Sequence, residues 1–432
     1  MPGPPRIARA LALAAIALVV GMVALVYRAA VVSNFFNDDF HWLYEARRLE
    51  WSNLVRLDRY DHFYRPVIEI YFHLGQRVFG CDPMPFHLLS VGIHLVNTLL
   101  LFLFTRALTA SPRIAFVTVL LFCVQPGYVE AVVWVGAITD LLPGTWLLLV
   151  LWLHLRFLQR QWWGDYGAAL AVFLVSLGTH ESAVAILPLM IVVDALFDWP
   201  RPRDVGSWIR VRGVRYLPFA AALAAFLVVA YVVNSRSYLV REGHYAFGWH
   251  AIANLFDYVA GMYVGRRRLL WHSGVALTSI AILWWGSPRM RFALAWIVVT
   301  LTPVLFFTWG TASRYLYVPA VGFALLMAEL VIGGAARLRR AGWSLRAVQS
   351  MTGLVVVVLV VRFGAFAENG VRNFRNQTRP FDRFVTAVRH AVPASSGELH
   401  LTPEDVEGID ALYRDAAAET ALCRPGVRVL VP

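Results

Sequence analysis

The sequence predicts an all-α polytopic membrane protein with about eleven transmembrane helices. Of its 432 residues, 59% are hydrophobic and 15% are charged, and the mean hydropathy is +0.60. A soluble domain usually carries about 25% charged residues. Apolar runs long enough to cross a bilayer recur along most of the chain, separated by short segments that contain arginine. Together these observations exclude a soluble globular domain.

The net charge of +12 does not indicate a nucleic-acid-binding protein. The sequence contains no Lys, so all 39 basic residues are Arg, and they cluster between the apolar runs. The positive-inside rule explains this distribution and predicts a cytoplasmic N-terminus, an odd number of spans and an extracytoplasmic C-terminus. The lack of Lys is typical of GC-rich coding. We therefore expect a multi-pass protein of a bacterial inner or plasma membrane, with membrane lipids and not nucleic acid as its surroundings.

The first apolar run, about residues 7–32, follows the basic start "RIAR" and exceeds the apolar core of a signal peptide, so we interpret it as an uncleaved anchor. Two of the later runs are joined by the polar break "GTHES" and could instead form one long helix with a kink. Ten further spans are predicted, at residues 86–106, 113–128, 139–157, 166–179, 182–198, 214–234, 269–286, 290–309, 314–334 and 347–366.

Within the transmembrane domain, residues 1–366, the first outer loop at 33–85 is long and polar. It contains two adjacent carboxylates, Asp38 and Asp39, among aromatic residues. It also contains the amphipathic segment "YRPVIEIYFHLGQRVFG", for which we predict a helix in the membrane interface with Pro66 at an early helix position.

The tail, residues 367–432, is predicted to form a small α/β extracytoplasmic module. Its segments "GELHLT" and "GVRVLV" are typical of short strands. Thr402 followed by Pro403 and two acids predicts the start of a helix. Cys81 and Cys423 fall on the same predicted side of the membrane and could pair, although sequence alone does not give their spacing.

Most catalytic motifs are missing: the sequence has no P-loop, no GxGxxG after a strand, no HExxH and no CxxC pair. The candidates are therefore polar residues in or beside apolar segments, where such groups are costly. In the second predicted span, His87, His94 and Asn97 share one helix face. They are predicted either to contact substrate or to make interhelical hydrogen bonds, and their spacing is too wide for one metal ion without a third helix.

The charged candidates share one property, since the predicted topology places all of them at the outer face. A guanidinium can bind phosphate through two parallel hydrogen bonds, and a carboxylate can take a proton from an acceptor hydroxyl. Such a set suits a substrate that has an anionic group and a reacting hydroxyl. These candidates are Asp38, Asp39, Arg65, Glu130, Asp140, His180, Glu181 and Arg314.

Five blocks of sequence, in this order, resemble the transmembrane and tetratricopeptide-repeat O-mannosyltransferase-like proteins of the GT-C superfamily. The likeness covers most of residues 34–330, and its specificity comes from the number and order of the blocks. The blocks are "NDDFHWL", "YRPVIEIYFHLGQRVFGCDPMPFHLLSVGIHLVNTLLLF", "QPGYVEAVVWVGAITDLL", "GTHESAVAILPLMIVVD" and "SRYLYVPAVGFALLMA".

This resemblance implies a GT-C-like bundle that moves a sugar from a polyprenyl-phosphate donor to a hydroxyl of a protein, lipid or cell-envelope glycan outside the cytoplasm. Asp38 and Asp39 occupy the place of the superfamily's catalytic acidic pair. One is then the general base and the other supports it, through a hydrogen bond or through a divalent metal, Mg²⁺ or Mn²⁺. The implied substrate-binding set comprises Arg65, His87, His94, Asn97, Glu130, Asp140, His180, Glu181, Arg314 and Tyr315.

The sequence departs from the family pattern at three blocks. "GAITDLL" keeps Asp140 but lacks the usual preceding cations, "THE" has His180 in place of a Lys, and "SRYLY" keeps Arg314 but has Ser313 in place of an acid. We also expect no tetratricopeptide array after the last span. A transporter or flippase for a lipid-linked sugar, and a non-catalytic membrane scaffold, are the alternative functions.

Overall fold

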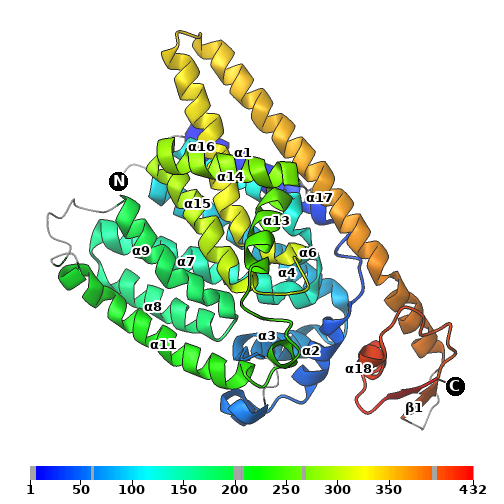
Figure 1. Ribbon diagram of the computed structural model, residues 1–432. Helices are drawn as coiled ribbons and strands as arrows, with labels where there is room; N and C mark the ends of the chain where they lie inside the picture. The colour runs from blue at the N-terminus through cyan, green and yellow to red at the C-terminus, as the bar shows by residue number, and fades with distance from the viewer. Residues whose placement is uncertain are drawn as a thin grey trace.

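A computed structural model describes residues 6–59, 63–197, 206, 209–264, 269–391 and 397–431. Most helices lie side by side in one bundle, and the chain ends in a small module beside it (Figure 1). A helix lies in each of the eleven predicted spans. These are α1 (Arg6–Tyr27), α4 (Pro83–Thr109), α5 (Pro112–Phe122), α7 (Ile138–Arg160), α8 (Trp163–Leu177), α9 (Ile186–Phe197), α11 (Val214–Asn234), α14 (Leu269–Trp285), α15 (Pro288–Leu301), α16 (Pro319–Arg340) and α17 (Leu345–His390).

The predicted all-α polytopic class is confirmed. Among the described residues, six helices are long and apolar enough to cross a membrane by themselves, or seven if α5 and the segment Pro126–Val133, bent by 48° against it, count as one span. The other predicted spans form shorter helices. The helices α8 and α9 are separate, with the 3₁₀ helix Glu181–Ala185 between them, so the alternative of one continuous kinked helix is wrong.

Local sequence signals set several helix starts. The side chains of Asp82, Ser111 and Ser287 accept hydrogen bonds from the first turns of α4, α5 and α15, and each of these residues precedes a proline at the first helical position. The core lies where these helices meet α7 and α16. There a Cβ at Gly322 of α16 would lie 2.7 Å from the carbonyl oxygen of Ala293 of α15, so a glycine is needed for this close helix contact.

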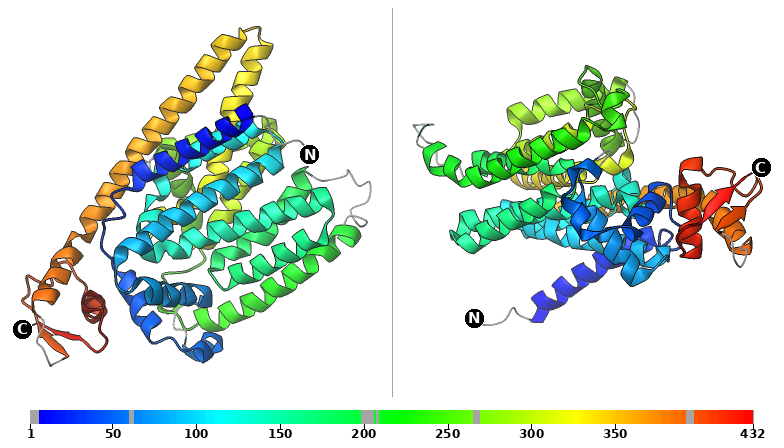
Figure 2. Two further views of the ribbon diagram at one scale, coloured as in Figure 1. Left: turned by 180° about the vertical axis from the view of Figure 1, so that it is seen from behind. Right: turned by 90° about the horizontal axis from the view of Figure 1, so that it is seen from below.

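The first outer loop is helical. Asp38–Arg47 forms α2 and Pro66–Phe79 forms α3, with Pro66 at its first position as predicted. Beyond the spans, α12 (Tyr238–Arg241) and α13 (His250–Val264) follow α11, and neither of these helices was predicted. The hairpin of α16 and α17 extends beyond the other helices at the end opposite the C-terminal module (Figures 1 and 2).

The C-terminal module contains two strands and one helix. β1 (Glu398–His400) pairs in parallel with β2 (Arg428–Leu430), which confirms both predicted strands. α17 has 46 residues and continues from the membrane domain into the tail, so the predicted boundary at residues 366/367 falls inside one helix.

The start of the last helix was predicted wrongly. α18 spans Ala411–Leu422 and its N-cap is Asp410, whereas the prediction placed the start at Thr402. Thr402 and Asp405 do exchange hydrogen bonds as in a helix start, with Thr402 N–H donating to Asp405 Oδ2 at 2.9 Å. The turn does not continue, because Gly408 adopts a left-handed φ of 79°.

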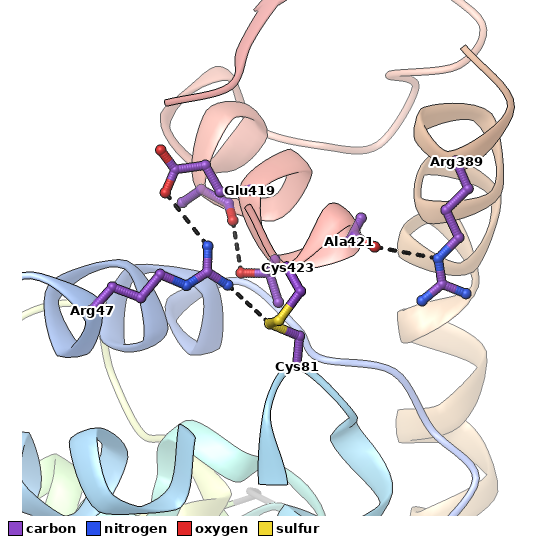
Figure 3. The surroundings of a disulfide bond; sticks show 8 residues. Arg47, Cys81, Arg389, Glu419, Ala421 and Cys423 are labelled. Atoms are coloured by element: carbon purple, nitrogen blue, oxygen red, sulfur yellow. Dashed lines mark hydrogen bonds and ion pairs between the residues drawn. A yellow bond between two sulfur atoms is a disulfide. The ribbon is translucent and has the colours of Figure 1, made fainter. Parts of the chain in front are cut away.

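A disulfide joins Cys81, between α3 and α4, to Cys423 at the end of α18, with the Cα atoms 5.7 Å apart (Figure 3). This confirms one of the two alternatives that the sequence left open. Next to the disulfide, Arg47 donates to Cys81 Sγ at 3.1 Å and lies 3.6 Å from Glu419. Arg48 of α2 also forms an ion pair with Glu419, at 3.0 Å. The C-terminal module is thus attached to the first outer loop covalently and by ion pairs.

Candidate active site

The two adjacent carboxylates lie in the first turn of α2, and their surroundings differ. Asp39 is fully buried. Its Oδ2 accepts a hydrogen bond from Phe36 N at 2.8 Å, and its Oδ1 accepts one from Gly136 N. Burial raises the pKa of the Asp39 carboxyl, an effect that these two backbone N–H groups oppose. Asp39 therefore anchors the start of α2 to the segment between α6 (Val129–Val133) and α7.

Asp38 is the partly exposed member of the pair. Its Oδ1 accepts a hydrogen bond of 2.5 Å from the hydroxyl of Tyr413, which lies on α18 of the C-terminal module. Burial raises the pKa of the Tyr413 hydroxyl, and its hydrogen bond to Asp38 raises it further, so Tyr413 is the donor. The second carboxylate oxygen of Asp38 accepts no hydrogen bond from any residue that the structure describes.

The pair does not fit a shared metal ion. Both oxygens of Asp39 already accept backbone N–H groups, and Gly136 leaves no space beside them, since a Cβ there would lie 2.8 Å from Asp39 Oδ1. Across the described parts of the chain, no group of three or more His, Cys, Asp or Glu side chains could hold a metal ion. The predicted Mg²⁺ or Mn²⁺ at Asp38 and Asp39 therefore has no suitable ligand set among the described residues.

Arg314 is the centre of a second group of charges. Its guanidinium donates to Glu130 Oε1 at 2.9 Å and to the Tyr315 hydroxyl at 3.2 Å, and its Nε lies 3.6 Å from Asp140 Oδ2. Ser313, where the family has an acid, donates through its hydroxyl to Glu130 at 2.5 Å. The predicted outer residues Glu130, Asp140, Arg314 and Tyr315 thus do come together.

Trp134 connects this group to the acidic pair. The Arg314 guanidinium lies 5.1 Å from the centre of the Trp134 ring. The Trp134 indole N–H donates to the carbonyl oxygen of Phe36 at 3.1 Å, and Phe36 N is one of the two donors to Asp39. The carboxylates and the guanidinium are therefore held in one framework of hydrogen bonds and ring contacts.

Arg65 lies at the start of α3 and forms an ion pair with Glu181, with Nη2 at 2.7 Å from Oε2. His180 Nε2 is 3.8 Å from the same carboxylate oxygen. Burial lowers the pKa of the His180 imidazole, and the positive charges of Arg65 and Arg314 lower it further. Burial and the two nearby cations therefore both favour the neutral form of His180.

The histidines and asparagine of α4 lie apart from these charges, in the helix core. His94 Nδ1 lies 2.9 Å from the Tyr317 hydroxyl, and Asn97 donates to the same hydroxyl at 3.0 Å. Asn97 also donates to the carbonyl oxygen of Leu141 at 3.2 Å. His87 is buried beside the backbone of residues 33–34. The contacts of His94 and Asn97 are interhelical hydrogen bonds, the alternative role predicted for these residues.

Three site residues were not predicted from the sequence. Trp134 lies inside a family block, where its position four residues after Glu130 was the available signal. Phe36 precedes the acidic pair and binds Asp39 through its backbone N–H, which any residue type could supply. Nothing in the sequence indicated that Tyr413 belongs to the site, because 375 residues separate it from Asp38.

No protein family model matches the chain. Protein O-mannosyl-transferase Tmtc1 of Drosophila melanogaster is 30% identical over 133 residues, which are 31% of this chain and 16% of that protein. Protein O-mannosyl-transferase F38B6.6 of Caenorhabditis elegans is 25% identical over 308 residues, 64% of this chain and 44% of that protein. The chain therefore matches less than half of the length of these curated relatives.

Among solved structures, the crystal structure of ArnT from Cupriavidus metallidurans bound to undecaprenyl phosphate has a TM-score of 0.56 and 14% sequence identity, over 96% of this chain and 85% of that chain. This likeness shows a shared fold. The chain is a multi-pass membrane protein with the GT-C fold. Its predicted resemblance to the transmembrane and tetratricopeptide-repeat O-mannosyltransferase-like proteins is confirmed, and these relatives are glycosyltransferases.

Proposed function

We propose that this protein is a glycosyltransferase that moves a sugar from a polyprenyl-phosphate donor to an acceptor hydroxyl on the extracytoplasmic side of the membrane. One observation carries the proposal: Asp38 is a partly exposed carboxylate beside the buried Asp39, and Trp134 connects this pair to Arg314. A base for the acceptor and a cation for a leaving phosphate thus belong to one framework.

In the proposed reaction Asp38 is the general base. The acceptor hydroxyl gives its proton to a carboxylate oxygen of Asp38 as its own oxygen bonds to the anomeric carbon of the sugar. The bond between that carbon and the phosphate oxygen breaks, and both of its electrons leave with the polyprenyl phosphate. Asp39 cannot act as the general base, because both of its carboxylate oxygens accept hydrogen bonds from backbone N–H groups.

Arg314 and Arg65 are the proposed partners of the phosphate. Charge that develops on the leaving phosphate is stabilised best by cations that are already held in place. Glu130 and Asp140 orient the Arg314 guanidinium, and Glu181 orients that of Arg65. The ArnT structure, with undecaprenyl phosphate bound, supports this class of donor.

The acceptor is proposed to approach the second carboxylate oxygen of Asp38, which accepts no hydrogen bond from the described residues. The Tyr413 hydroxyl, 2.5 Å from Asp38 Oδ1, orients the carboxylate. Tyr413 can stay in place during turnover, because the disulfide and the Glu419 ion pairs hold α18 beside the first outer loop. The acceptor class proposed is a hydroxyl of a protein, lipid or cell-envelope glycan.

Two features support the extracytoplasmic side. Disulfides persist in oxidising compartments, and Cys423 of the Cys81–Cys423 disulfide directly follows α18, the helix whose Tyr413 contacts Asp38. The last turn of α16, at the opposite end, carries Arg337, Arg339 and Arg340, as expected for a cytoplasmic segment.

To test this, purified protein is incubated with a cell-envelope acceptor extract and a radiolabelled sugar donor. The donor is either a polyprenyl-monophosphate sugar or a nucleotide sugar. We expect transfer from a polyprenyl-monophosphate sugar and none from a nucleotide sugar, because a membrane-embedded site takes a lipid-borne donor. Transfer from the nucleotide sugar alone would overturn the donor class. Absence of transfer from every donor would favour the transporter or the scaffold.

A further inference from the structure

A cavity of about 470 Å³ lies between the end of α1 and the outer part of α17, apart from the proposed reaction site. Four guanidinium groups dominate its wall. Three come from α17 positions that share a helix face, and the fourth directly follows α1. The lining residues are Arg28, Ala29, Arg372, Arg375, Asn376, Arg379 and Asp382.

The cavity lies at the level where two apolar helices leave the membrane. The apolar span of α1 ends at Tyr27, one residue before Arg28. A Cβ at Gly364 of α17 would lie 3.9 Å from Val26, so the two helices are adjacent at this height. The sequence of α17 turns polar soon after Phe366. Lipid headgroups occupy this level of a bilayer.

The charges in this cavity are only partly compensated. Glu368 forms ion pairs with Arg28 at 2.6 Å and with Arg372 at 2.7 Å. Neither Arg375 nor Arg379 forms an ion pair with any residue that the structure describes. Four guanidinium groups therefore face two carboxylates, Glu368 and Asp382, and the net charge is positive.

The positive-inside rule disfavours such a group of arginines at this end of the bundle, which is the end that carries the disulfide. α17 also uses a different face for packing. Its Phe374 and Phe381 contact Phe36, while Arg375 and Arg379 are exposed. The arginines thus contribute little to the packing of α17, and an anionic ligand explains their placement.

We propose that this cavity binds the phosphate of an anionic membrane-lipid headgroup. Guanidinium groups bind phosphate oxygens through paired, charge-assisted hydrogen bonds. The position next to two apolar spans favours a phosphate carried on a lipid over a free anion, because the acyl chains can lie along α1 and α17. This site is independent of the proposed glycosyl transfer.

The structure allows a local probe of this site. Asn376 lines the cavity, and Asn376→Cys supplies a thiol for an environment-sensitive fluorophore. The native cysteines do not compete, because Cys81 and Cys423 form the disulfide and Cys123 is buried. Labelled full-length protein in a neutral detergent is titrated with short-chain phosphatidylglycerol, short-chain phosphatidylcholine or inorganic phosphate.

We expect phosphatidylglycerol to bind more tightly than either other probe. In the labelled protein, Arg375→Gln with Arg379→Gln should weaken phosphatidylglycerol binding about 30-fold, since each Arg near an anionic lipid contributes about fivefold. The matched control is Arg346→Gln, an exposed arginine in the first turn of the same helix, far beyond a Debye length from the cavity, which should change binding by less than about twofold. The unfolding temperature of each variant checks its folding.

Two results would overturn the proposal. One is unchanged phosphatidylglycerol binding in the double variant. The other is inorganic phosphate binding as tightly as the lipid, which would show an anion site with no preference for a membrane component. A double variant with Lys at both positions distinguishes the forked guanidinium from charge alone, and we expect it to bind with intermediate strength.

Discussion

Two adjacent and identical side chains, Asp38 and Asp39, have different environments. Consecutive residues of a helix point in different directions, so only Asp39 turns toward the protein interior. There it connects α2 to Gly136, 97 residues further along the chain. The sequence predicted that one member supports the other. It did not predict which aspartate is the supporting one, because the contact between Asp39 and Gly136 joins segments that are distant in sequence.

At this scale the first prediction concerns Gly136. Gly136→Ala places a Cβ 2.8 Å from Asp39 Oδ1, so either the carboxylate or the segment must shift. We expect the free energy of unfolding to fall by about 1–3 kcal/mol, as is typical of overpacking, and glycosyl transfer to fall with it. Thermal unfolding and a transfer assay measure the two effects.

The matched control is Gly167→Ala. Gly167 is an exposed position of α8, and a Cβ there meets no atom within 4 Å. Alanine in a helix interior should stabilise by about 0.5–1 kcal/mol. If Gly136→Ala behaved like this control, the anchoring role of Asp39 would be wrong.

At the scale of elements, hydropathy predicted where helices lie, because a bilayer demands long apolar segments whatever they pack against. Hydropathy did not predict that α17 continues into the tail, because residues 367–390 are polar. This part of α17 is stabilised by its buried face, which packs on the loop near Phe36. The start of α18 was misjudged because Thr402 and Asp405 form a local turn that closes before a helix can follow.

The prediction for this scale concerns the attachment of the C-terminal module. The module should be disulfide-linked to the first outer loop, since Cys81 and Cys423 are bonded and Cys123 is the free cysteine. Alkylation of unreduced, denatured protein should modify Cys123 alone, and modify all three cysteines after reduction. Mass spectrometry of the peptides reads this out. Free thiols at Cys81 and Cys423 before reduction would contradict the attachment.

For the whole molecule, the fold brings the outer ends of several helices together at one end of the bundle. The charged candidates at these ends were predicted to share one face, and apart from the acidic pair they form two groups, one around Arg314 and one around Arg65. The role of the C-terminal module could not be predicted, because its contact with Asp38 joins opposite ends of the chain. That contact makes the module part of the proposed acceptor site.

The most direct test of the account is the transfer rate of Asp38→Asn. The substitution keeps the shape of the side chain and removes the base. Loss of a positioned general base costs about 10²- to 10⁴-fold in rate, so we predict a fall of that size with an unchanged unfolding temperature. Asp58→Asn is the matched control, an exposed carboxylate in the same outer loop that pairs only with Arg56 among the residues described, and it should transfer at the wild-type rate. Wild-type transfer by Asp38→Asn would contradict the proposed mechanism.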